Sequence, residues 1–192
     1  MTAPPAGRPR LVVGLSGSSA PQLGIALLRA TRDLGTVETH LVMSRGAERT
    51  VKLEADLDPA EVAALADVVH DSGDLAASIS SGSFRTIGMV VIPCSMRTLS
   101  AIATGNTTDL LSRAADVTLK ERRRLVLVPR ETPLNLIHIR NMETVTLAGA
   151  TVLPPMPAFY HRPRSIDDLI NHIVGKVLDQ FDIEHDLFTR WS

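Results

Sequence analysis

The chain has 192 residues, a formal net charge of -1 and only 3% aromatic residues. These values give no reason to expect a nucleic-acid partner, because such a partner usually requires a basic patch or a base-stacking surface. The single cysteine excludes an internal disulfide framework and favours a reducing compartment, so we expect the cytoplasm. No apolar run is long enough to span a membrane.

Residues 1–9 are rich in proline and predict a disordered tail, whereas residues 10–192 are long enough to form one domain. The first predicted strand, residues 11–13, enters a turn of small residues that ends at Ser19, and a helix follows from about Pro21. This arrangement presents backbone N–H groups to an anion, usually a phosphate. Ser19 and Gln22 also fit a capping box, so a helix cap without a ligand remains an alternative.

Strands and helices then alternate along the chain. Further strands are predicted at residues 37–43, 87–92, 125–128 and 151–153. Helices are predicted at residues 47–54, 59–66, from the turn after Pro93 to about 104, and at 109–120, 135–147 and 165–181. We expect Asp58 to cap the second of these helices, Asn106 or Thr107 the fourth, and Pro93 to end a strand. Residues 67–83 carry no clear pattern.

This alternation predicts an α/β fold with a Rossmann-like, doubly wound parallel sheet in a three-layer αβα arrangement. Ligands of such sheets bind outside the carboxyl ends of the strands. Polar clusters follow the predicted strands at residues 16–19, at Ser44, at residues 94–98 and at residues 130–131. We therefore expect these four clusters to meet at one edge of the sheet.

Four segments carry a resemblance to a known family. They are GSSAPQLG at residues 17–24, PCSMRTLSAIATG at 93–105, LLSRAADVTLKERRRLVLVPRETP at 110–133 and PAFYHRPRSIDDLI at 157–170. Together they resemble the flavin prenyltransferase family (UbiX-like), from about residue 10 to residue 191. The resemblance implies a transferase that needs no metal and assembles as a homo-oligomer, usually a dodecamer, with active sites between subunits.

The implied reaction joins a dimethylallyl group from dimethylallyl monophosphate to N5 and C6 of reduced FMN. Its product, prenylated FMN, is the cofactor of a partner decarboxylase of the UbiD type. The resemblance implies that the flavin is held by Gly17, Ser18, Ser19, Ser44, Ser95, Met96, Arg97, Thr98 and Arg113. It assigns the donor phosphate to Arg113, Lys120, Arg130, Tyr160 and Lys176, and catalysis to Ser19, Glu54, Lys120 and Glu131.

Several residues have alternative interpretations. Lys176 stands where the family commonly has arginine, which keeps the charge but loses the bidentate fork. Cys94 is expected to be a buried small residue rather than a nucleophile. Trp191 is either part of a closing C-terminal segment or a hydrophobic anchor on a neighbouring subunit. We interpret His138, His161 and His172 as structural or surface residues, because their spacing does not fit a metal site.

Two rival functions stay open. The first is a flavin-dependent decarboxylase of cysteine-type substrates, which shares the fold but generally carries P-A-S-A-N-T where this chain has PCSMRT at residues 93–98. The second is a non-catalytic FMN carrier subunit of a decarboxylase. Only the prenyltransferase predicts that the mass of the flavin changes.

Overall fold

The computed structural model describes residues 7–191 and contains a six-stranded sheet in the order β3-β2-β1-β4-β5-β6. All neighbouring strands pair in parallel. The strands are β1 (Arg10–Leu15), β2 (Glu38–Met43), β3 (Val68–His70), β4 (Gly88–Cys94), β5 (Arg124–Pro129) and β6 (Thr151–Val152). The predicted doubly wound parallel sheet is therefore confirmed, and its order is that of dinucleotide-binding folds.

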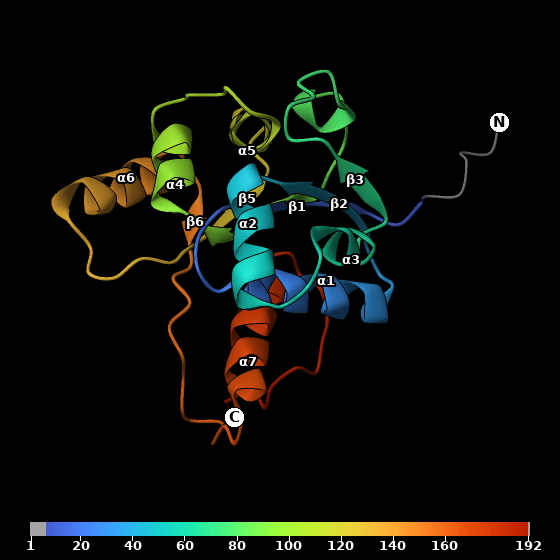
Figure 1. Cartoon of the computed structure of the whole chain (residues 1–192), viewed down its shortest axis with the longest axis vertical. Helices are drawn as coiled ribbons and strands as arrows, with labels where there is room; N and C mark the ends of the chain where they lie inside the picture. The colour runs from blue at the N-terminus through green and yellow to red at the C-terminus, as the bar shows by residue number, and fades with distance from the viewer. Residues whose placement is uncertain (1–6, 192) are drawn as a thin grey trace.

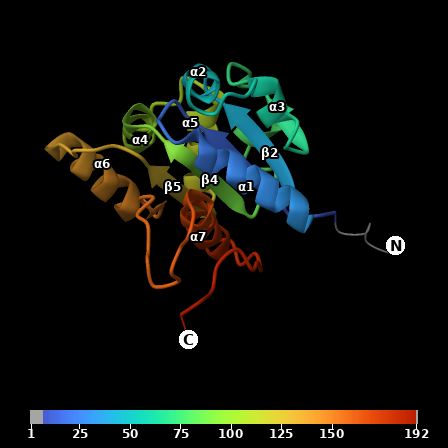
Figure 2. The same cartoon turned by 60° about the horizontal axis from the view of Figure 1, so that its bottom comes forward.

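Helices cover both faces of the sheet in three layers (Figures 1 and 2). One face packs against α1 (Pro21–Leu34), α2 (Arg45–Glu54), α3 (Pro59–Ala63) and α7 (Ile166–Asp179). The other packs against the short 3-10 helix η1 (Ser78–Ser80), α4 (Met96–Ala103), α5 (Leu110–Lys120) and α6 (Leu136–Leu147). The whole of β4 is buried, as expected for a parallel strand covered on both sides.

Local sequence signals account for most helix starts. Asp58, Asn135 and Ser165 each accept a bond from a backbone N–H group in the first turn of the following helix. The predicted Asn106 or Thr107 cap is wrong. Asp109 caps α5 instead, because its carboxylate accepts the N–H of Ser112 at 2.8 Å.

Two strand predictions also required correction. Pro93 does not end β4, which continues to Cys94 with an irregular register after Val91. A proline has no N–H group to donate to a strand ladder. Pro93 is tolerated here because the ladder between β4 and β5 is interrupted at this position. The unassigned residues 67–83 contain β3, which has three residues, and η1, so both were too short to leave a periodic pattern.

Of the predicted disordered tail, residues 1–6 lie outside the described residues. Arg8 donates to the carbonyl of Val37 at 3.0 Å and pairs with Asp67, so contacts with the fold begin two residues before β1. Among the residues described, we find no helix with the length and apolar character needed to cross a membrane.

Candidate functional site

The carboxyl ends of the central strands bring three of the predicted polar segments together. The Ser16 hydroxyl donates to the carbonyl of Pro93 at 3.0 Å and accepts the N–H of Ser95 at 2.7 Å. The Ser18 hydroxyl donates to the carbonyl of Arg130 at 2.8 Å. The turn after β1 is therefore bonded to the segments that follow β4 and β5.

The segment after β2 joins the same edge. The N–H of Ser44 donates to the carbonyl of Leu15 at 2.9 Å, which places Ser44 beside the end of β1. All four predicted clusters thus meet at one edge, as the parallel topology requires (Figure 2). We call this edge, formed by residues 16–19, 44–46, 95–98 and 130–131, the rim.

Two rim serines are helix caps. The hydroxyl of Ser44 accepts the N–H of Ala47 at 3.1 Å and begins α2. The hydroxyl of Ser95 accepts the N–H of Thr98 at 3.2 Å, donates to the hydroxyl of Thr98 at 3.1 Å, and begins α4. Both helices therefore start at the rim, with their positive dipole ends turned toward it. Met96 and Arg97 lie in the first turn of α4.

The predicted capping box at Ser19 is wrong. The N-cap of α1 is Ala20, in a left-handed conformation with φ of 71°, and no side chain caps the helix. The Ser19 hydroxyl and the Ala20 N–H both donate to Oε2 of Glu54, at 2.8 and 3.0 Å. The side chain of Gln22 donates to the Glu54 carbonyl at 2.7 Å, so the end of α2 is fastened to the start of α1.

The rim has unused capacity for an acidic ligand. Within residues 7–191, the main-chain N–H groups of Gly17 and Ser19 have no acceptor. Two helix starts face the same place, and a turn of small residues allows a ligand to approach the backbone closely. These features fit the phosphate or ring carbonyls of a flavin.

A second hollow lies beside Arg130. A cavity of about 240 Å³ opens between Arg130 and Glu131 on one side and apolar side chains that include Leu134, Met142 and Met156 on the other. Within the described chain, the guanidinium of Arg130 forms no ion pair, whereas the carboxylate of Glu131 accepts the N–H of Thr132 at 3.0 Å. A cation beside an apolar wall suits a ligand with a phosphate and a short hydrocarbon chain.

The two predicted cations of α5 lie at different ends of that helix. Arg113 is near its start, which lies beside Arg97 and Thr98 of the rim, and pairs with Asp116 at 2.8 Å. Lys120 is the last residue of α5 and pairs with Glu121. Strand β5 starts at Arg124, just after Lys120, and ends beside Arg130 at the rim. A strand of six residues is about 20 Å long, so Lys120 lies about that far from the rim, near the opposite edge of the sheet.

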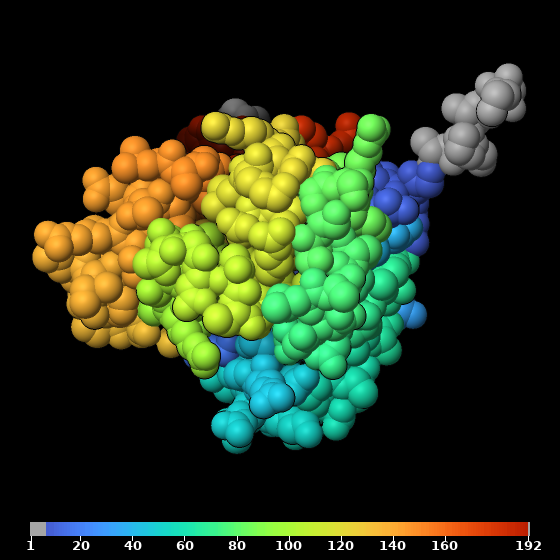
Figure 3. Space-filling model, turned by 90° about the horizontal axis from the view of Figure 1, so that it is seen from above, coloured from blue at the N-terminus to red at the C-terminus, as the bar shows by residue number. Residues whose placement is uncertain are grey.

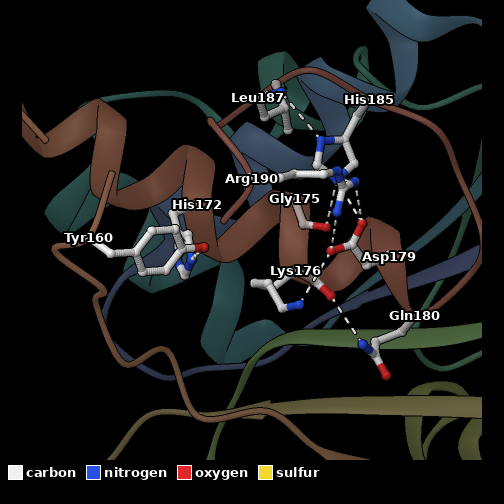
Figure 4. A network of polar contacts seen from close by, with 9 residues as sticks. All are labelled: Tyr160, His172, Gly175, Lys176, Asp179, Gln180, His185, Leu187 and Arg190. Carbon is white, nitrogen blue, oxygen red and sulfur yellow. Dashed lines mark hydrogen bonds and ion pairs between the residues drawn. The ribbon is translucent and has the colours of Figure 1, made fainter. Parts of the chain in front are cut away.

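Tyr160 and Lys176 belong to a C-terminal part of the structure (Figure 4). The Tyr160 hydroxyl lies 3.1 Å from Nε2 of His172, on α7. Lys176 pairs with Asp179 at 3.4 Å. His161 stacks on His172 with a ring separation of 5.0 Å, so both rings pack within this C-terminal part. His138 also has a structural contact, since its N–H donates to Asn135 at the start of α6.

Cys94 is fully buried, and its burial raises the pKa of the thiol to about 12. A thiol that stays protonated and out of reach of solvent is not a nucleophile. The prediction of a buried small residue is therefore confirmed.

Sequence reasoning missed the acidic residue of the C-terminal part. Asp179 accepts bonds from Arg190 at 2.7 and 3.2 Å and lies 3.2 Å from His185. The spacing of Lys176 and Asp179, three residues apart on a helix, indicates their ion pair. No local signal indicates the pair with Arg190, which comes from the chain after the helix.

Both the sequence and the fold are similar to those of known proteins. The Flavoprotein family model matches residues 4–178. The chain is 58% identical over 185 residues to "Flavin prenyltransferase UbiX" of Escherichia coli (strain K12), an alignment that covers 95% of this chain and 98% of the relative.

Solved structures agree with this likeness. A crystal structure of AnUbiX (PadA1) in complex with FMN and dimethylallyl pyrophosphate has a TM-score of 0.95 and 57% identity, covering 97% of this chain and 98% of that one. The dodecameric FMN-dependent Ubix-like decarboxylase of Escherichia coli O157:H7 has a TM-score of 0.93 and 54% identity, covering 95% of this chain and 99% of that one.

Proposed function

Because this chain belongs to the UbiX flavin prenyltransferase family, we propose that its rim binds FMN and that the enzyme transfers a dimethylallyl group to it. The flavin is held by Gly17, Ser18, Ser19, Ser44, Ser95, Met96, Arg97, Thr98 and Arg113. The observation that carries this proposal is the hydrogen bond between Ser19 and Glu54 at the rim, beside N–H groups that have no acceptor in the described chain.

Reduced FMN supplies the electron-rich ring atoms N5 and C6 to which the dimethylallyl group is joined. Ser19 is the residue placed to handle a proton there. Its hydroxyl donates to Glu54 at 2.8 Å and can also accept a bond, so a proton can pass between the carboxylate and a group at the rim. The second bond from Ala20 to the same oxygen fixes the direction of the carboxylate.

The donor phosphate belongs beside Arg130 in this proposal. Its guanidinium has no ion-pair partner within residues 7–191, so it is available to a phosphate, and the apolar wall near Met142 suits the dimethylallyl chain. Cations there stabilise the charge on the phosphate as its carbon–oxygen bond breaks. Glu131 is placed to orient Arg130 or to move a proton.

Lys120 can share this site only if a second copy of the chain supplies it, since it lies near the opposite edge of its own sheet. Helix α6 supports association between copies. Four of its large apolar side chains are exposed, namely Leu136, Ile137, Ile139 and Leu147, and Figure 3 shows this part of the chain projecting from one side. We infer a homo-oligomer, with the dodecamer of the E. coli O157:H7 relative as its expected size.

The donor and the recipient follow from the family. Dimethylallyl monophosphate is the proposed donor, although the AnUbiX relative was crystallised with the pyrophosphate. Prenylated FMN would pass to a UbiD-type decarboxylase. We propose the cytoplasm as the compartment, because the chain has a single cysteine and needs no oxidising environment to form a disulfide.

The test is anaerobic incubation of the protein with reduced FMN and dimethylallyl monophosphate, followed by mass spectrometry of the released flavin. We expect the mass of the flavin to increase by one prenyl unit. A parallel sample with the pyrophosphate identifies the donor. An unchanged flavin with both donors would contradict the proposal and leave the cysteine-type decarboxylase or the FMN carrier. Incubation with a peptide that ends in cysteine separates these two, because only the decarboxylase would release carbon dioxide.

A further inference from the structure

The chain after α7 folds back along that helix and lies directly on it (Figure 4). The contact is closest at Gly175. A Cβ atom at this position would lie 2.5 Å from Cε1 of Phe188 and 2.6 Å from Cε1 of His185. Both distances are too short for real contacts, so glycine at position 175 allows the two rings to rest on the helix backbone.

Asp179 fastens this segment to the helix. Its carboxylate accepts Nη2 of Arg190 at 2.7 Å and Nη1 at 3.2 Å, a bidentate pair. The Asp179 side chain is only 17% exposed, and its bond with Arg190 keeps the pKa of the carboxyl below its ordinary value. Asp179 is therefore charged and paired at neutral pH.

His185 strengthens the same attachment. The N–H of Leu187 donates to Nδ1 of His185, so the ring proton lies on Nε2. Nε2 is 2.9 Å from the carbonyl of Gly175 and 3.2 Å from Asp179. The His185 side chain is fully buried, and these contacts satisfy its donor.

The residue after Arg190 is Trp191, and its ring meets Tyr160 edge to face at 5.6 Å. The hydroxyl of Tyr160 bonds to His172, whose ring contacts Phe188 at 4.8 Å. The folded-back segment thus touches Tyr160 directly, through Trp191, and indirectly, through Phe188 and His172. Because Trp191 follows Arg190 directly, the position of Arg190 determines where the ring of Trp191 contacts Tyr160.

We propose that Asp179 is a positioning residue: by holding Arg190, it sets Trp191 against Tyr160 and keeps the phenol directed for the donor phosphate. Tyr160 and Lys176 are two of the donor-phosphate residues that the family resemblance implies, so this inference rests on the proposed function. Asp179 does not touch the donor in this account. It acts through Arg190, Trp191 and Tyr160.

A purely electrostatic role makes the opposite prediction. Asp179 carries a negative charge and pairs with Lys176, a proposed phosphate ligand. If charge alone mattered, removing the carboxylate would free Lys176 and tighten binding of the donor. If position matters, the same change releases Arg190 and weakens binding. The sign of the change in KM therefore separates the two roles.

The experiment compares full-length wild type with Asp179→Asn, Arg190→Gln and the double variant. We expect KM for dimethylallyl monophosphate to rise about fivefold with kcat nearly unchanged, because the donor loses uniform binding. The double variant should be no worse than either single variant, since both break one contact. Asp179→Glu should recover part of the loss. Asp182→Asn, which removes the exposed partner of Arg124, is the matched control and should leave KM unchanged.

A second readout does not depend on activity. Trp191 is the only tryptophan, so its fluorescence anisotropy reports how firmly the segment is held. We expect lower anisotropy in Asp179→Asn and Arg190→Gln. Arg190 is 56% exposed, so its variant tests the proposal even if Asp179→Asn fails to fold. Unchanged or lower KM, or unchanged anisotropy, in the folded variants would overturn the proposal. Wild-type protein that forms no prenylated flavin would instead overturn the proposed function.

Discussion

Gly17 and Gly46 meet backbone to backbone at the rim. A Cβ atom on Gly17 would lie 2.8 Å from Cα of Gly46, and one on Gly46 would lie 3.0 Å from Cα of Gly17. Neither position has a left-handed φ, so the requirement for glycine comes from this close approach and not from the backbone conformation. The contact sets how the turn after β1 meets the first turn of α2.

Gly17→Ala is therefore expected to disturb flavin binding more than it disturbs the fold. The backbone atoms of residue 46 cannot rotate away from an added methyl group, so the turn itself must move, at a cost of about 1–3 kcal/mol. We expect the Kd for FMN, measured by fluorescence titration, to rise about tenfold or more.

The matched control for this variant is Gly73→Ala. A Cβ atom there meets only Oδ1 of Asp71, at an ordinary 3.4 Å. Urea unfolding of both variants separates loss of stability from loss of binding. Wild-type affinity for FMN in Gly17→Ala would show that the close contact does not shape the site.

Subunit mixing tests whether Lys120 and Ser19 of different copies build one site. Ser19→Ala and Lys120→Ala should each retain FMN but lose prenyl transfer. Because the two residues lie at opposite edges of one chain, an oligomer assembled from equal amounts of both variants should recover roughly a quarter of wild-type activity. An active site needs Ser19 from a Lys120→Ala copy and Lys120 from a Ser19→Ala copy. Random mixing brings these two together in about one site in four.

Lys52→Ala is the control for loss of a lysine charge, because Lys52 is exposed and pairs with Asp58 only at 3.9 Å. It should keep full activity. No recovery in the mixed oligomer, with both parents folded, would mean that the two residues serve the same site from one chain. Full activity of Lys120→Ala alone would remove Lys120 from the mechanism.

Local signals predicted much of this fold. The apolar run before the first turn and the buried run in β4 indicated central strands, and the helix predicted from residue 165 matches α7, where Ser165 and Asp168 form a capping box. These features depend on neighbours within a few residues. The meeting of the polar clusters was also predictable, because parallel strands end at a shared edge.

The partner of Ser19 was not predictable in the same way. Ser19 and Gln22 have the spacing of a capping box, but Glu54, 35 residues after Ser19, takes the hydroxyl instead. The N–H of Ala20 donates to the same carboxylate, and Ala20 is the N-cap of α1 in a left-handed conformation, so the serine does not hold the capping position. The place of Lys120 could have been found, since a helix that precedes a parallel strand ends at the strand's amino edge.

Cys94 should be inert in the folded protein. With a pKa of about 12, a fraction on the order of 10⁻⁴ of the thiol is ionised at pH 8, and the sulfur is also buried. We expect no reaction of native protein with a thiol reagent over hours, and rapid labelling of the single thiol in urea. Cys94→Ala should remain active and lose about 1 kcal/mol of stability. Fast labelling of the native protein would contradict the buried position of Cys94 in β4.

Protonation of His172 should destabilise the protein. Burial holds the pKa of His172 below its ordinary value of 6.5, and the nearby charges of His161 and Lys176 act in the same direction, while Asp179 opposes them. Its Nε2 faces the hydroxyl of Tyr160, and its Nδ1 is buried without a partner in the described chain. The unfolded chain therefore binds a proton at a higher pH than the folded protein does.

It follows that this contribution to stability is complete above pH 6.5 and declines as the pH falls through 6.5 toward the lower folded pKa. Urea unfolding at one protein concentration should show a smaller free energy at pH 5.5 than at pH 8, and His172→Gln should reduce that difference. His70, whose pKa is also lowered by burial, contributes a separate part, so His70→Gln serves as the comparison. If His172→Gln keeps the full wild-type dependence on pH, protonation of His172 is not what weakens the fold in acid.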